Sequence, residues 1–121
     1  MIEREITADA VADMAALLNG AEWEVVNGRG YQTVDVSDKL PDFKRAFFVK
    51  LPPGTSMHKH VDCGDCQTDH VVITTNPQCL NYWGNDPIHM EVGKRYTVDR
   101  TIEHWAVNDG DTDRIHLLLE Y

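Results

Sequence analysis

The fold is decided by residues 103–121, which read EHWAVNDGDTDRIHLLLEY. A turn sequence, NDGD, separates two segments with the composition of β-strands, at 102–107 and 113–120. Because side chains alternate along a strand, Arg114 and His116 share one face of the second segment. Aliphatic side chains fill such positions in an ordinary core strand, and polar groups there cost free energy unless ligation or pairing offsets it. The stretch therefore predicts two neighbouring strands with a polar site on one face.

The rest of the chain continues the pattern of short strands between turns. Further strands are expected at 22–26, 31–36, 44–51, 55–62, 69–75, 78–83, 88–92 and 95–99. Turn sequences separate several of them, at Pro52-Pro53-Gly54, Gly84-Asn85-Asp86-Pro87 and Gly93-Lys94. One amphipathic helix is predicted at about 7–19, with Thr7 as its N-cap and an apolar stripe for packing. Together these elements favour an all-β jelly-roll barrel with a short N-terminal helix.

The bulk composition limits the class of protein. A length of 121 residues and a hydrophobic content of 42% indicate one globular domain, 1–121. The net charge of −9 argues against a nucleic-acid partner, because binding a phosphate backbone needs a cationic surface. The sequence has no run of about 18 apolar residues, so no membrane span is expected. The charged start, MIEREITADA, lacks an apolar signal core, and a cytoplasmic location is expected.

A metal site is predicted from three residues that come from two distant strands. His60 and Asp62 are two apart, so on a strand they point to the same face, and His104 comes from a later strand that returns beside the first. Two imidazoles and one carboxylate are the ligand set of non-haem Fe(II) oxygenases, and they leave half of an octahedron open for a co-substrate and O₂. Arg114 lies far enough past His104 for a tight turn and a neighbouring strand. Its guanidinium is suited to bind a carboxylate through two parallel hydrogen bonds.

Four segments resemble a known family. They read LPPGTSMHKHVD at 51–62, TDHVVITTN at 68–76, EVGKRYTVD at 91–99 and EHWAVNDGDTDRIHLLLEY at 103–121. They are similar to the aspartyl/asparaginyl β-hydroxylases, including their proline-hydroxylase-like members. These proteins are Fe(II)- and 2-oxoglutarate-dependent oxygenases on a double-stranded β-helix. The resemblance runs from about residue 44 to the end of the sequence.

This resemblance implies a set of roles. Arg114 would hold the distal carboxylate of 2-oxoglutarate, and His70 would also contact this co-substrate. His116 matches a frequent family residue beside the arginine and would have no more than a supporting role. The iron ligands, which are also the catalytic residues, would be His60, Asp62 and His104. The implied reaction is O₂-dependent hydroxylation of an amino acid, a protein side chain or a related small metabolite, with conversion of 2-oxoglutarate to succinate. A small-molecule or peptide substrate is therefore the expected partner.

The sequence also departs from the family pattern. Thr68 stands where many members have an arginine, two residues before His70, so a substrate or co-substrate contact is lost or replaced. Relatives tend to be longer, with extra elements that cover the site. The edge strands of a short jelly roll commonly need cover, which leaves a homodimer open.

Two other functions compete with the oxygenase. In a cupin-type metalloprotein, His58, His60 and His104 would bind the metal, with Asp65 nearby and without 2-oxoglutarate. The glutamate usual in that motif is absent, and Arg114 has no role in it. The third hypothesis is a non-enzymatic barrel that binds a small molecule. Metal and 2-oxoglutarate binding separate the three, because the oxygenase needs both, the cupin needs metal alone and the barrel needs neither.

The cysteines carry a weaker signal. Cys63, Cys66 and Cys79 are odd in number and do not form a disulfide framework, which fits a reducing compartment. The Cys63-x-x-Cys66 pair suggests a zinc site or a loop disulfide, but a structural zinc site needs four ligands and no second pair is present. Two free thiols on a loop are the preferred interpretation.

Overall fold

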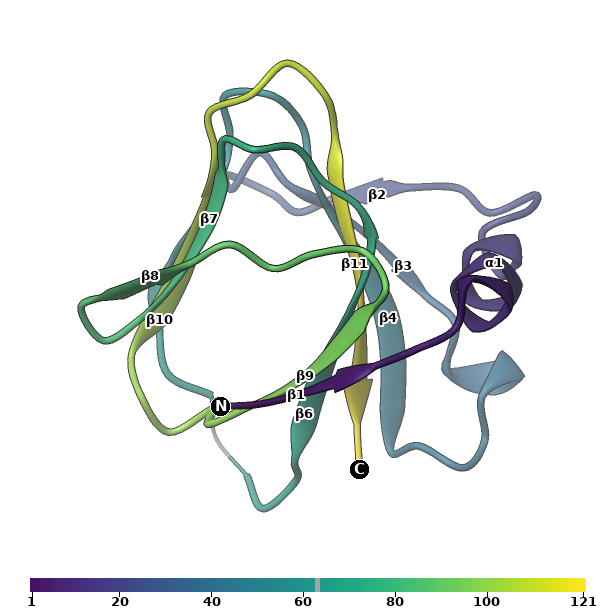
Figure 1. The fold of residues 1–121 in the computed structure, drawn as a ribbon. Coiled ribbons are helices and arrows are strands. Elements are labelled where there is room, and N and C mark those ends of the chain that lie inside the picture. Colours follow the sequence, from purple (N-terminus) through teal and green to yellow (C-terminus); the bar gives the residue numbers. More distant parts are fainter. Residues whose placement is uncertain (63) are drawn as a thin grey trace.

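The computed structural model describes residues 1–62 and 64–121. Within these residues, two antiparallel sheets curve toward each other to form an open barrel (Figure 1). The larger sheet has the order β1-β9-β6-β11-β4-β3-β2. Its strands are β1 (Ile2–Glu5), β2 (Glu24–Val25), β3 (Gln32–Asp35), β4 (Arg45–Leu51), β6 (Thr68–Thr74), β9 (Lys94–Val98) and β11 (Arg114–Glu120).

The smaller sheet has the order β5-β10-β7-β8. Its strands are β5 (Ser56–His60), β7 (Cys79–Trp83), β8 (Asp86–Ile88) and β10 (His104–Asn108). A helix, α1 (Ala8–Ala16), and a 3₁₀ turn, η1 (Ser37–Lys39), complete the described elements. The prediction of an all-β jelly roll with a short N-terminal helix is confirmed.

The two faces of the larger sheet have different partners. One face carries an aliphatic and aromatic cluster of Val34, Val36, Ala46, Phe48, Val71, Leu117 and Leu119. Helix α1 lies outside the barrel (Figure 1), and Met14 packs against this cluster together with Leu17 and Leu18 just beyond the helix. The helical stripe is therefore a packing surface, and Thr7 caps the helix by accepting a hydrogen bond from the Ala10 N–H at 3.1 Å.

The opposite face of the sheet points into the barrel. A second apolar cluster lies there, formed by Val72, Trp83, Met90, Tyr96 and Val98. Buried polar side chains occupy neighbouring inward positions, namely His70, Asn81, His104, Arg114 and His116. The strand alternation read from the sequence is thus confirmed for β6, β10 and β11, and it gives the barrel interior a polar region beside an apolar one.

Some element boundaries differ from the prediction. The prediction of a strand at 88–92 is wrong, because β8 spans Asp86–Ile88. Pro87, which was assigned to a turn, lies within this strand. Proline is tolerated there because β8 is the last strand of its sheet, where a missing N–H breaks no ladder. Strand β1 was not expected, since all four of its residues are exposed and it shows no apolar alternation. Pairing with β9 alone makes it a strand.

The turn between β10 and β11 fixes the relation of His104 to Arg114. Asn108 is fully buried, and its amide donates hydrogen bonds to the carbonyls of Leu51, at 2.8 Å, and Thr112, at 2.9 Å. Its side-chain oxygen accepts hydrogen bonds from Gly110 N–H and from the Asn76 amide. A Cβ added at Gly110 would overlap that Asn76 amide, so the turn requires glycine here.

Candidate functional site

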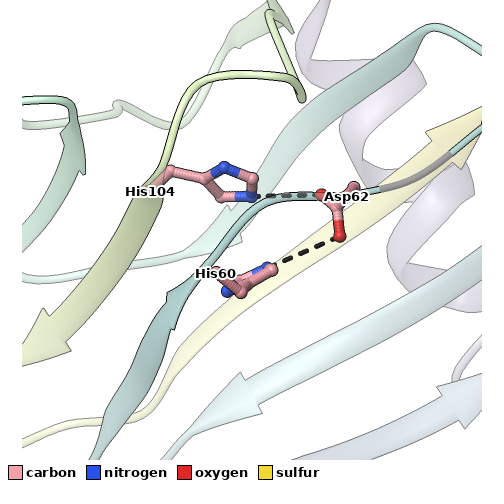
Figure 2. Close-up of side chains that lie close together, drawn as sticks. All are labelled: His60, Asp62 and His104. Carbon is pink, nitrogen blue, oxygen red and sulfur yellow. Dashed lines mark ion pairs between the residues drawn. The ribbon is translucent and has the colours of Figure 1, made fainter.

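The three predicted metal ligands converge where β5 ends and β10 begins (Figure 2). His60 pairs with His104 across the two strands. One carboxylate oxygen of Asp62, Oδ2, lies 3.1 Å from His104 Nε2, and the other, Oδ1, lies 3.6 Å from His60 Nε2. The three ligand atoms lie within 4.8 Å of one another. Bonds of roughly 2.1 Å at right angles would separate neighbouring ligands by about 3 Å, so this spacing fits one metal ion after small adjustments.

Asp62 reaches the site by a different route from the one predicted. Strand β5 ends at His60, so Asp62 does not stand on the strand and simple alternation does not apply to it. Its backbone N–H donates to the carbonyl of Arg100 at 3.0 Å, which holds the segment after β5 beside the segment before β10. This contact directs the carboxylate back toward both imidazoles.

Both imidazoles are oriented for ligation through Nε2. His60 Nδ1 lies 2.7 Å from the carbonyl of His58, and His104 Nδ1 lies 2.7 Å from the carbonyl of Ile102. A carbonyl only accepts hydrogen bonds, so each Nδ1 carries a hydrogen and each Nε2 faces the carboxylate. The ring of Trp83 stacks on His104 with a centroid distance of 5.2 Å and an interplanar angle of 5°, which fixes the plane of this ligand.

His104 and Asp62 shift the pKa of each other. Burial lowers the pKa of His104, but hydrogen bonds to Asp62 and to the Ile102 carbonyl outweigh it, so its pKa is raised. The same hydrogen bond from His104 lowers the pKa of Asp62. A divalent cation bound between these two groups would take the place of the hydrogen that they share.

Beside these ligands lies a cavity of about 590 Å³, and Arg114 lies in its lining. The Arg114 residue is only 3% exposed. Its Nη2 donates to Asn81 Oδ1 at 2.5 Å, and its Nε has no hydrogen-bond partner within residues 1–62 and 64–121. Burial lowers the pKa of Arg114 to about 10. No carboxylate of the described residues pairs with it, so the cavity offers a desolvated positive charge to an anionic ligand.

His70 lines the same cavity and is 9% exposed. Its Nδ1 lies 3.0 Å from the Nδ1 of His116, and its ring meets that of Trp83 edge to face. Burial lowers the pKa of His70 to about 3, so its imidazole is neutral at ordinary pH. The structure thus brings both predicted co-substrate residues, His70 and Arg114, into one cavity with the three candidate ligands.

His58 does not join the ligand cluster. It is exposed, and its ring lies 5.0 Å from that of His60 between centroids. Within the described part of the chain, the cluster able to hold a metal consists of His60, Asp62 and His104. This geometry favours the facial-triad ligand set over the cupin set that includes His58.

Sequence reasoning missed Asn81, the hydrogen-bond partner of Arg114. A signal was present, because Asn81 is a polar residue at an inward position of β7 between two buried neighbours, Cys79 and Trp83. The interpretation of Cys63 and Cys66 as two free thiols lies in part outside the described residues, because Cys63 is not among them. Cys66 is a free thiol, and its sulfur accepts a hydrogen bond from the Arg100 guanidinium.

The fold and these side chains define a cupin-like barrel with a candidate two-histidine, one-carboxylate metal centre. The family model for aspartyl/asparaginyl beta-hydroxylase matches residues 20–121, and the chain belongs to this family. The match begins well before residue 44, where the resemblance of the motifs started. No curated protein matches the sequence. Among the described residues, no helix is long and apolar enough to cross a membrane.

Solved structures share the fold. A 2OG-Fe(II) oxygenase family oxidoreductase from Burkholderia pseudomallei superposes with a TM-score of 0.77 at 8% identity, over 95% of this chain and 78% of that one. A predicted oxalate decarboxylase from Thermotoga maritima gives 0.67 at 15% identity, over 99% and 97% of the two chains. The Cnp3 cupin domain from Schizosaccharomyces pombe gives 0.68 at 12% identity, over 85% and 69%. At these identities the likeness establishes the cupin-like barrel, and the family match supports an oxidoreductase of the oxygenase kind.

Proposed function

We propose that this protein is an Fe(II)- and 2-oxoglutarate-dependent dioxygenase. Its substrate would be an amino acid, a protein side chain or a related small metabolite, which it would hydroxylate while 2-oxoglutarate is decarboxylated to succinate. One observation supports the proposal beyond family membership: the buried guanidinium of Arg114, which pairs with no carboxylate among the described residues, lies in the same cavity as His60, Asp62 and His104. A metal centre needs no buried cation beside it, whereas a dicarboxylate co-substrate does.

Three side chains of the protein would hold the metal ion. The two Nε2 atoms and the Asp62 carboxylate would hold Fe(II), and the hydrogen bonds from each Nδ1 to a backbone carbonyl would keep the rings in place. When bound, Fe(II) with 2-oxoglutarate and O₂ supplies the oxidative decarboxylation and the hydroxylation of a C–H bond. Three protein ligands leave the remaining positions for these reactants.

Arg114 would bind the far carboxylate of 2-oxoglutarate. Asn81 already engages Nη2, which restrains the guanidinium before the ligand arrives. A charge pair at a buried site is stronger than in water, and the fold has already desolvated the positive charge of Arg114. His70, which is neutral, would add a hydrogen bond without adding charge.

The direct test is turnover. The Fe(II)-loaded protein is incubated with 2-oxoglutarate and O₂ across a panel of free amino acids and peptides, and succinate is measured. We expect one or more panel members to raise succinate formation and to gain one oxygen atom. Succinate formation that no added compound stimulates, together with no 2-oxoglutarate binding, would remove the oxygenase function.

A cupin-type metalloprotein without 2-oxoglutarate is the second candidate. The observation in its favour is that His58 also lines the cavity, on the strand that carries His60. In that case His58→Ala would lose the metal, and Asp62→Ala would keep it. A non-enzymatic barrel would show neither metal-dependent nor 2-oxoglutarate-dependent behaviour.

A further inference from the structure

We propose that His116 is a positioning residue that holds His70 in one tautomer. In this proposal His116 Nδ1–H donates to His70 Nδ1, so that His70 presents its Nε2–H to the cavity. The inference rests on the proposed function in one respect: the ligand beside His70 and Arg114 is taken to be a carboxylate.

The contact between the two rings is direct and buried. The Nδ1 atoms lie 3.0 Å apart, and the ring planes meet at 89° with centroids 5.3 Å apart. His116 is 1% exposed and stands on β11, two residues beyond Arg114 and on the same face. His70 is part of the cavity lining, whereas His116 is not and contacts the ring of His70. The contact therefore occupies the nitrogen of His70 that is turned toward His116 and leaves Nε2 as the ring's other polar atom.

The two Nδ1 atoms share one hydrogen, so the tautomer of one histidine determines the tautomer of the other. Burial lowers the pKa of both histidines, and the positive Arg114 nearby lowers them further, so both rings are neutral. A neutral imidazole carries one hydrogen, and a hydrogen bond between two Nδ1 atoms uses one donor and one acceptor. If His116 is the donor, His70 carries its hydrogen on Nε2. If His70 is the donor, its Nε2 presents a lone pair to the cavity.

Only the first arrangement suits the charge of the cavity. An anion held by Arg114 attracts an N–H and is repelled by a lone pair. His116 thus acts at a distance from the ligand: it removes the tautomer of His70 that would oppose the carboxylate. This role differs from direct support of Arg114. The guanidinium of Arg114 is already held by its hydrogen bond to Asn81.

The tautomers can be read without any metal or substrate. Long-range ¹H–¹⁵N correlation spectra of the ¹⁵N-labelled, metal-free protein distinguish protonated from unprotonated ring nitrogens, and loss of signals in His70→Asn and His116→Asn assigns the two rings. We expect His116 to carry its hydrogen on Nδ1 and His70 on Nε2. The reverse pattern, or a spectrum in which either ring is charged at pH 7, would overturn the proposal. This measurement stands even if 2-oxoglutarate proves not to bind, which would count against the proposed function alone.

A pair of variants tests the consequence for binding. In His116→Asn the side-chain amide occupies the place of Nδ1 and keeps a donor, whereas His116→Leu has none. With the Mn(II)-loaded protein, we expect the Kd for 2-oxoglutarate to rise at least tenfold in His116→Leu and to stay within about threefold in His116→Asn, with metal affinity unchanged in both. His89→Leu, which alters an exposed histidine outside the cavity lining, is the control and should leave both affinities unchanged. Equal affinities in the Leu and Asn variants would refute the positioning role.

Discussion

Replacing Arg114 by Met tests whether this arginine binds a ligand or supports the core. Burial lowers the pKa of Arg114 from 12.5 to about 10, so keeping it charged in the folded protein costs roughly 3 kcal/mol. The hydrogen bond from Arg114 to Asn81 stabilises the folded protein by about 1.5–3 kcal/mol. These terms nearly cancel, and Met fills much of the same space. We therefore expect the free energy of unfolding to stay within about 1.5 kcal/mol of the wild type.

Ligand binding should respond very differently. Removing one partner of a desolvated charge pair costs about 2–5 kcal/mol, which corresponds to a roughly 30- to several-thousand-fold rise in Kd for 2-oxoglutarate. Calorimetric titration of 2-oxoglutarate into the anaerobic, Fe(II)-loaded wild type and variant measures this change. Urea unfolding of the same preparations gives the stability, and Fe(II) affinity should be equal in both.

Arg95 provides a matched control outside the cavity. Its Nε donates to the Asp69 carboxylate at 2.5 Å, and Asp69 is completely buried. Arg95→Met should lower the free energy of unfolding by about 1–3 kcal/mol, since Arg4 and Tyr121 still contact that carboxylate, and should leave 2-oxoglutarate affinity unchanged. If Arg114→Met behaves like this control, with stability lost and affinity kept, the co-substrate role of Arg114 is refuted.

Three further predictions concern the ligands, the buried histidines and the turn. His58→Ala should keep Fe(II), whereas Asp62→Ala should lose it; the opposite result in a metal-binding assay would favour the cupin ligand set. Burial lowers the pKa of His70 and His116 below the usual 6.5, so the unfolded chain binds more protons than the folded one as the pH falls. The free energy of unfolding should therefore fall by roughly 1–2 kcal/mol from pH 7 to 5.5. The raised pKa of His104 acts in the opposite direction and offsets part of this loss. Urea titrations that show no fall over this range would contradict the buried neutral pair. Gly110→Ala should lower the melting temperature by several degrees, since its Cβ overlaps a side-chain amide, and an unchanged temperature would show that the turn can relax.

Much of the site could be predicted from the sequence because it depends on local rules. Strand alternation places His104 and Arg114 on inward faces once the turn between them is recognised, and the structure confirms both. The residue types of the candidate metal centre are visible in the sequence. These features require only the period of a strand and the chemistry of single side chains.

The remainder depends on contacts between distant parts of the chain. Asp62 lies beyond its strand, and a backbone hydrogen bond to Arg100 brings it to the site. The contact of His70 with His116 joins residues 46 positions apart, and its geometry follows from the bulged pairing of β6 with β11. Strand β1 has no pattern of its own and forms because β9 offers an edge. No local rule predicts such pairings.

The most direct test of the proposed metal centre and co-substrate is one anaerobic spectroscopic titration. Fe(II) and then 2-oxoglutarate are added to the wild type, to His104→Ala and to Arg114→Met, and the visible absorption that arises when 2-oxoglutarate chelates Fe(II) is recorded. We predict a band in the wild type only when both are present, no band in His104→Ala, and a band in Arg114→Met only at far higher 2-oxoglutarate. A wild type that binds Fe(II) but develops no band, or a band that survives unchanged in both variants, would contradict the assignment of the site.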